Sequence, residues 1–196
     1  MSVHPAKPTP SERERTGGYV VIAAMVILMW LVETIDVAAG DLDSAGIHPR
    51  DAEGLTGIAA SPFLHAGFGH LIGNTIPFLV LGLAIAVGGL MRTLAVVGIV
   101  ALVGGLGTWL TAPSNTVVIG ASGLVFGFAT YLVARGAYSR TPWHIVGGLV
   151  VLAIYGSTLL VGLFPTPGVS WQGHLFGGIG GVVAARALDR TRRVSR

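Results

Sequence analysis

One serine, two histidines and one asparagine are the side chains of this 196-residue chain whose types and spacing best fit catalysis. They are His70, Asn74, Ser122 and His174, and each lies in an otherwise apolar stretch. A serine hydroxyl beside a neutral imidazole is the minimum arrangement for an activated nucleophile. His70 precedes Ser122 by 52 positions, and Ser122 precedes His174 by another 52. This spacing is long enough for two regular elements that run in opposite directions, together with their loops. After each such step the chain returns to the same face of the molecule, so all four side chains are expected at the same depth.

The composition indicates which elements position these side chains. Hydrophobic residues make up 52% of the chain, charged residues only 11%, and the mean hydropathy is +0.75. A soluble domain of this size has too much surface to hide so many apolar residues, and disordered chains have the opposite composition. The absence of cysteine excludes a disulfide scaffold, a thiol nucleophile and a thiolate metal site. A multi-span membrane protein remains.

Six stretches are long enough to cross the hydrocarbon core as helices, which takes about 20 mostly apolar residues. Apolar residues occur on all sides of these stretches, as expected for helices that touch lipid and one another. The sequence therefore predicts an all-α membrane protein built as a bundle of six transmembrane helices. The expected helices cover residues 19–38, 70–89, 93–111, 120–136, 143–162 and 171–188.

The basic residues predict the orientation of this bundle. Of the twelve lysines and arginines, only Arg50 falls on one side, and the positive-inside rule assigns the other side to the cytoplasm. We therefore expect both termini in the cytoplasm and a multi-pass protein of a bacterial plasma membrane. The net charge of +3 reflects this topology, so no nucleic-acid partner is expected. The expected organisation is a flexible cytoplasmic tail over residues 1–17, a six-span core over 18–188 and a basic cytoplasmic tail over 189–196.

A cleaved signal peptide is the alternative interpretation of the first apolar stretch. Residues 20–32 resemble a signal-peptide core, and residues 37–39 resemble a weak cleavage site. Glu33 and Asp36 between them fit this reading badly. We interpret both acidic residues as hydrogen-bond formers that hold the long external loop, which spans about residues 39–69.

The glycine pattern predicts which helices touch. The second, fourth and sixth expected helices run inward, and their polar residues lie in the first two turns, within several ångströms of the outer end. Small residues four positions apart let helix backbones approach closely. Contact between the fourth and sixth helices would bring His174 to the Oγ atom of Ser122. The two stripes consist of Gly123 and Gly127, and of Gly173, Gly177 and Gly181.

Each polar residue has a simpler explanation when taken alone. A membrane serine often bonds to its own helix, and a lone histidine or asparagine can join two helices. A metal or haem site of His65, His70 and His174 is a further alternative, but no His-Glu-x-x-His motif occurs. An aspartyl intramembrane protease is disfavoured because the chain has no Gly-x-Gly-Asp motif. A transporter is disfavoured because the sequence shows neither an inverted repeat nor a charged pathway. Four independent polar residues in one layer argue for a common site.

Three blocks of sequence resemble the rhomboid intramembrane serine proteases. They are His65-Ala-Gly-Phe-Gly-His70-Leu-Ile-Gly-Asn74, Gly120-Ala-Ser122-Gly123, and Gly173-His174-Leu-Phe-Gly177-Gly-Ile-Gly-Gly181. The resemblance covers about residues 19–188, in the family's order. Each block alone is a modest signal, and the three together are specific.

The resemblance implies a role for each of these positions. Ser122 would be the nucleophile and His174 the general base, a dyad without an acid. His70, Asn74 and the backbone N–H of Ser122 would stabilise the oxyanion. His65 would brace the first loop, and the remaining supporting positions are Gly120, Gly123, Phe126 and Gly177.

The resemblance also implies substrates and a route to the site. The substrates would be transmembrane segments of membrane proteins with small residues at the cleavage site, admitted beside the second or fifth helix. No cofactor is expected, and the oligomeric state is left open. The alternative is a rhomboid-like pseudoprotease that binds transmembrane partners without cleaving them.

Two departures from the family pattern stand out. Many members carry an adjacent Trp-Arg pair in the first loop, whereas that register holds Thr56 and Gly57 here. We therefore expect the packing of the loop to differ. Many members also place a tyrosine four residues after the serine, where this chain has Phe126, which can stack on the histidine but has no hydroxyl.

Overall fold

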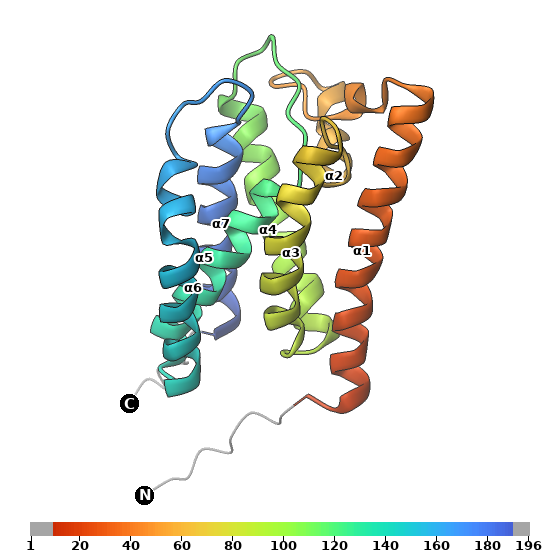
Figure 1. Cartoon of the computed structure of the whole chain (residues 1–196). Coiled ribbons are helices and arrows are strands. Elements are labelled where there is room, and N and C mark those ends of the chain that lie inside the picture. Colours follow the sequence, from red (N-terminus) through yellow and green to blue (C-terminus); the bar gives the residue numbers. More distant parts are fainter. Residues whose placement is uncertain (1–9, 190–196) are drawn as a thin grey trace, which may run out of the picture.

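The computed structural model describes residues 10–189, and within them the chain forms helices and loops without a β-strand (Figure 1). The expected all-α class is therefore confirmed. A long connection between the first two long helices holds α2 and three short 3-10 helices, η1 (Leu42–Ala45), η2 (Glu53–Leu55) and η3 (Ser61–Phe63). The α-helices are α1 (Glu12–Ala39), α2 (Gly57–Ala60), α3 (Phe68–Ala86), α4 (Leu90–Thr111), α5 (Ser122–Ser139), α6 (Pro142–Val161) and α7 (Trp171–Asp189).

The six long helices occupy the six stretches expected from the sequence. Four of them, α1, α3, α4 and α6, are long and apolar enough to cross a membrane. α5 and α7 have similar lengths but their apolar stretches are less apolar than those of the other four. Both have many buried residues, because they lie in the middle of the bundle, where close packing replaces contact with the surroundings.

The first helix starts earlier than expected. α1 begins at Glu12, so the flexible tail expected over residues 1–17 is wrong for its last six residues. The N–H of Ser11 donates to the Glu14 carboxylate at 2.7 Å, and the N–H of Glu14 donates to Ser11 Oγ at 3.3 Å. This capping box satisfies two free N–H groups and stabilises the start of the helix. The parts of the two expected tails at 1–9 and 190–196 lie outside the described residues.

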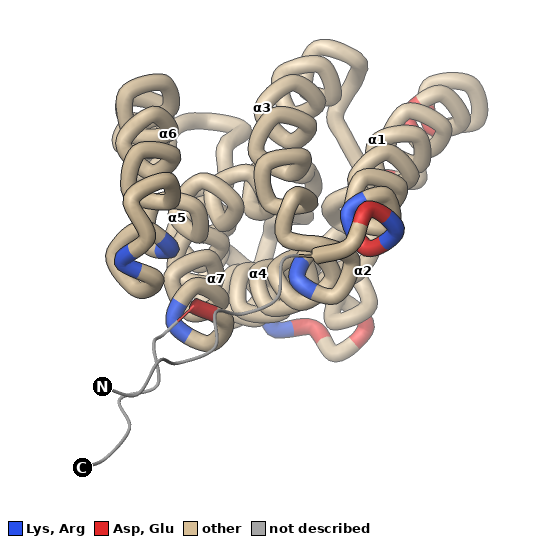
Figure 2. Tube along the Cα trace, turned by 90° about the horizontal axis from the view of Figure 1, so that it is seen from below, with Lys and Arg blue, Asp and Glu red and all other residues tan. Residues whose placement is uncertain are grey.

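The start of α1 and the end of α7 lie at the same end of the bundle, termed here the terminal end (Figure 1). The opposite end, which carries the long connection, is termed the loop end. α5 packs against α3, α6 and α7, whereas α1 packs on α3 and α4. Seen from the terminal end, α6 and α1 lie on the two flanks, and the charged residues gather near the helix ends (Figure 2).

Glycines allow α5 and α7 to pack backbone against backbone. A Cβ on Gly177 would lie 2.2 Å from the carbonyl oxygen of Gly123, and a Cβ on Gly181 would lie 2.0 Å from that of Gly127. Side chains cannot be accommodated at such distances. The helix contact predicted from the glycine spacing is therefore confirmed.

The long connection between α1 and α3 is folded onto the rest of the loop end. Ile47 pairs with Val118, which lies just before α5, through two backbone hydrogen bonds of 2.9 and 3.0 Å. Asp36 Oδ1 accepts the N–H of Leu42 at 2.6 Å, as expected for a residue that holds this loop. Glu33 is only 1% exposed and lies near the N–H of Gly67 without a hydrogen bond of ordinary geometry. The expected hydrogen-bonding role therefore applies to Asp36 and not to Glu33.

Arg50 fastens this connection to the C-terminal end of α4. Its Nη1 atom donates to the carbonyl oxygens of Leu110 and Ala112 at 3.1 and 2.7 Å. The indole N–H of Trp109 donates to the carbonyl of Asp51 at 2.7 Å, and the carbonyl of Trp109 accepts the N–H of Arg50 at 3.0 Å. A cation suits the free carbonyls at a helix end. An arginine and a tryptophan that are distant in sequence thus hold the loop of a chain without an adjacent Trp-Arg pair.

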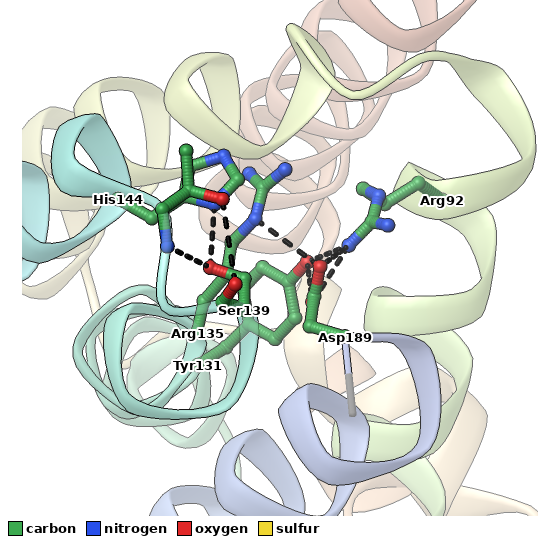
Figure 3. Close-up of polar contacts among 7 residues, drawn as sticks. Arg92, Tyr131, Arg135, Ser139, His144 and Asp189 are labelled. Atoms are coloured by element: carbon green, nitrogen blue, oxygen red, sulfur yellow. Dashed lines mark hydrogen bonds and ion pairs between the residues drawn. The ribbon is translucent and has the colours of Figure 1, made fainter. Parts of the chain in front are cut away.

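A buried ion pair joins three helices at the terminal end (Figure 3). Arg92 Nη1 donates to both carboxylate oxygens of Asp189, at 2.8 and 2.7 Å, and to the hydroxyl of Tyr131 at 2.5 Å. That hydroxyl donates to Asp189 at 3.0 Å, and Arg135 Nε lies 3.4 Å from the same carboxylate. The sequence analysis assigned Asp189 to the C-terminal tail, and this assignment is wrong, because Asp189 is part of the helical core.

Candidate active site

Ser122 and His174 meet across the contact between α5 and α7. Ser122 is the first residue of α5, and His174 is the fourth residue of α7. The Nε2 atom of His174 lies 2.9 Å from Ser122 Oγ, and the histidine is only 7% exposed. The structure therefore brings together the two residues that the sequence paired.

The second ring nitrogen of His174 determines which tautomer the ring adopts. Nδ1 lies 2.8 Å from the carbonyl oxygen of Gly162, the residue that follows α6. Because a carbonyl oxygen only accepts hydrogen bonds, Nδ1 must carry the proton of the neutral ring. Nε2 then presents its lone pair to the hydroxyl of Ser122, as required of a base that removes the hydroxyl proton.

Phe126 holds the plane of the imidazole. The Phe126 and His174 rings are stacked, with centroids 4.0 Å apart and an angle of 5° between their planes. Phe126 lies one turn after Ser122 on α5, so the same helix supplies the hydroxyl and the stacking ring. The stacking expected for this phenylalanine in place of tyrosine is confirmed.

His70 and Asn74 lie on α3 beside the turn that precedes Ser122. Gly120 has a φ of +110°, a conformation that suits glycine. A Cβ at this position would lie 2.8 Å from Cε1 of His70, so the absence of a side chain lets the imidazole approach the turn. The same position lies 3.9 Å from the amide nitrogen of Asn74.

Both α3 side chains keep a donor free for a ligand. His70 Nδ1 accepts the N–H of Ala66 at 3.3 Å, so Nε2 carries the proton of the neutral ring. The Asn74 amide nitrogen uses one hydrogen to donate to the carbonyl of His70 at 3.1 Å, which leaves its second hydrogen available. The first N–H groups of α5 also have no acceptor within their helix.

These groups line a cavity of about 300 Å³ at the loop end. The cavity is large enough for several water molecules or for part of a peptide. Its walls come from α3, α4, α5 and α7, from the long connection between α1 and α3, and from the loops before α5 and α7. The polar side chains in its lining are those of Ser61, His70, Asn74, Thr108, Ser122, Ser170 and His174.

His65 braces the turn that carries the serine as well as its own loop. Its Nε2 atom accepts the N–H of Ala121 at 3.4 Å, and its ring meets the His70 ring edge to face at 5.1 Å. His65 is fully buried. Burial and the neighbouring His70 lower the pKa of His65 to about 4, which keeps the ring neutral and able to accept this hydrogen bond.

Comparison with known proteins identifies the family. The model of the Rhomboid domain matches residues 52–190, which include every predicted site residue. The chain belongs to the rhomboid family. Typical members are serine proteases of the membrane, and the rhomboid chain described here is an integral membrane protein by its family and its apolar helices.

Relatives of this rhomboid occur in bacteria. An uncharacterized protein of Mycobacterium tuberculosis is 44% identical over 205 positions, which cover 98% of this chain and 85% of the relative. An uncharacterized protein of Mycobacterium leprae is 43% identical over 189 positions, covering 91% of this chain and 74% of the relative. A Bacillus subtilis protein named "Putative rhomboid protease YdcA" is 30% identical over 120 positions, covering 60% of this chain and 59% of the relative.

Sequence reasoning missed two features of the site. Gly162 appeared only as the expected end of a helix, because no side-chain pattern reveals a carbonyl that contacts a ring. Arg50 appeared only as a charge on the external side, although it is the only lysine or arginine in the long loop over residues 39–69. Within residues 10–189, no group of three or more His, Asp or Glu side chains is arranged to hold a metal ion.

Proposed function

We propose that this rhomboid is an intramembrane serine endopeptidase that cleaves transmembrane segments of membrane proteins with Ser122 and His174. The observation that carries the proposal is the 2.9 Å contact between His174 Nε2 and Ser122 Oγ, in a ring whose other nitrogen donates to a carbonyl. A serine in this setting is an activated nucleophile. A pseudoprotease would keep the fold without needing this arrangement.

The reaction follows the usual order for a serine nucleophile. Ser122 Oγ attacks the carbonyl carbon of the scissile peptide while His174 Nε2 takes the hydroxyl proton. The imidazolium then donates this proton to the leaving amine, and an acyl-enzyme ester remains on Ser122. A water molecule from the cavity then attacks the ester while it gives a proton to His174 Nε2, and His174 returns this proton to Ser122 Oγ as the second product leaves with its new carboxyl group.

The negative charge of the tetrahedral intermediate would develop at the start of α5. His70 Nε2–H, the free hydrogen of the Asn74 amide and the N–H of Ser122 are the donors we assign to it. The positive end of the α5 dipole favours the same charge. Each donor of this kind typically contributes about 10²–10³ to the turnover rate.

The membrane placement is part of the proposal. All six long helices would cross the bilayer, with α5 and α7 shielded by the four apolar ones, and the terminal end would face the cytoplasm. The cavity then opens near the outer leaflet, where water for hydrolysis can reach it. The substrates are membrane proteins embedded in the same bilayer, at a plasma membrane like those of the bacterial relatives.

The decisive experiment compares wild-type protein with Ser122→Ala on a generic transmembrane substrate in detergent and in liposomes. Wild type should cleave and should react with a fluorophosphonate probe, and Ser122→Ala should do neither. His174→Ala should be as inactive, and the double variant no worse, because a dyad acts as one unit. Ser157→Ala, at an exposed serine on α6, is the matched control and should keep full activity. Cleavage by Ser122→Ala would exclude the serine mechanism.

A further inference from the structure

α6 is buried in the bundle mainly over its first half, whereas Tyr155 and Leu159 in its second half are only partly buried against the core. Its two buried residues, Gly148 and Val151, both lie in its first half, and the rest of the helix has none. A Cβ on Gly148 would lie 3.1 Å from the Cα of Val133, so α6 touches the α5 backbone there. A hydrogen bond of 2.8 Å between Ser139 and His144 strengthens this attachment at the terminal end (Figure 3).

At the loop end, α6 touches the site through the backbone of Gly162. The carbonyl oxygen accepts the Nδ1 hydrogen of His174 at 2.8 Å. A Cβ at this position would lie 2.3 Å from Cζ of Phe126 and 3.0 Å from Nδ1 of His174. The backbone of Gly162 is in the ordinary helical region. Glycine is therefore needed for the close approach to the two rings.

This carbonyl decides where the proton of the neutral imidazole resides. Stacking on Phe126 restrains the plane of the ring, but it does not distinguish between the two tautomers. Within the described residues, no carboxylate bonds to His174, and its Nδ1 contact is the Gly162 carbonyl. In Ser-His-Asp enzymes a carboxylate has this task, and its loss disables the histidine through the wrong tautomer.

We propose that the Gly162 carbonyl, presented by the loop end of α6, is the positioning group that keeps the proton on Nδ1 of His174, so that cleavage requires α6 in its packed position. This inference rests on the proposed function of the dyad. Outward displacement of α6 breaks the hydrogen bond and lets the proton move to Nε2. In that tautomer Nε2 can no longer accept the proton of Ser122. The most exposed helix of the bundle thereby controls the state of the base.

The test uses the same substitution at two positions near the end of α6. Gly162→Ala adds a methyl group that must push the carbonyl away from His174, whereas Gly156→Ala meets no atom within 4 Å. We expect kcat of Gly162→Ala to fall about tenfold or more, as for a lost hydrogen bond that also redistributes tautomers, with little change in KM. Gly156→Ala should match wild type in both constants.

Nitrogen NMR of the full-length protein in detergent reports which ring nitrogen of His174 carries the proton, a property that a change in packing alone would not alter. With ¹⁵N-labelled histidine, the His174 signals are assigned by their loss in His174→Gln. Wild type near pH 8 should show a protonated Nδ1 and a bare Nε2, and Gly162→Ala should show a mixture of tautomers. The wild-type spectrum tests the hydrogen bond even if Gly162→Ala fails to fold.

Three results would overturn the inference. They are a wild-type spectrum with the proton on Nε2, wild-type kcat in folded Gly162→Ala, or a loss of activity in that variant with the tautomer unchanged. Failure of the proposed function is a separate result. Wild-type protein would then neither cleave substrate nor react with the fluorophosphonate, whatever the tautomer of His174.

Discussion

Replacing Asn74 with alanine separates a catalytic donor from a structural residue. Asn74 is buried in α3, and its amide makes one hydrogen bond in the structure, to the carbonyl of His70 in the same helix. No contact between helices depends on that bond. The second amide hydrogen is free for the oxyanion, so Asn74→Ala should affect the reaction far more than the fold.

The two effects differ widely in magnitude. Loss of one oxyanion donor typically costs about 10²–10³ in kcat, or about 3–4 kcal/mol of transition-state stabilisation. A side-chain hydrogen bond between membrane helices averages only about 0.6 kcal/mol. One kcal/mol shifts the unfolding midpoint by about 2–4 °C in a protein of this size. Asn74→Ala should therefore lower single-turnover cleavage more than a hundredfold and lower the midpoint by at most a few degrees.

The neighbouring Thr75 provides a matched control. Its hydroxyl also donates to a carbonyl one turn back, that of Leu71 at 2.8 Å, and it accepts the indole N–H of Trp30 on α1 at 3.1 Å. Thr75 does not line the cavity. Thr75→Ala should lose at least as much stability as Asn74→Ala and keep its cleavage rate. If folded Asn74→Ala instead cleaves at the wild-type rate, Asn74 is structural and the assignment of the oxyanion site to it is refuted.

Further predictions concern the terminal end, the buried loop histidine and the topology. Asp189→Ala leaves Arg92 without its carboxylate and should cost about 3 kcal/mol of unfolding free energy, seen as a lower thermal midpoint, while the folded fraction cleaves normally; an unchanged midpoint would contradict the role of this ion pair. Because the pKa of His65 is lowered to about 4 from an ordinary 6.5, the unfolded chain binds the proton first, so stability should fall as the pH decreases from about 6.5 to 4. Midpoints measured across this range should vary less in His65→Gln, and equal slopes would argue against a buried neutral histidine. Reporter fusions after Arg140 should read cytoplasmic and those after Asn115 external, and an external signal at Arg140 would reverse the proposed orientation.

The helices and the pairing of Ser122 with His174 could be predicted from the sequence because they depend on local patterns. Length and apolar composition placed the ends of the six long helices to within about three residues, except for the start of α1. Glycines four positions apart indicated the contact between α5 and α7, since close backbone approach excludes side chains. The start of α1 was misplaced although Ser11 and Glu14 form a capping signal visible in the sequence.

The features that escaped prediction depend on backbone atoms or on distant partners. The bond from His174 to the Gly162 carbonyl has no sequence signal, because every residue has a carbonyl and only packing selects one. The contacts that join Arg50, Trp109 and Asp51 were also not predicted. A guanidinium can reach any exposed helix end, so the sequence does not show which one it contacts. Asp189 was assigned to a tail because its partner, Arg92, lies 97 positions earlier.

The sequence by itself therefore determined the class of protein, the helices and the identity of the serine and histidine, since apolar length, glycine spacing and residue type are local properties. Only the tertiary structure decided the tautomer of His174, the free donors on His70 and Asn74 and the deeper burial of the first half of α6. These properties follow from which carbonyl or ring lies within about 3 Å of which nitrogen. Such distances arise only when helices far apart in the sequence pack together.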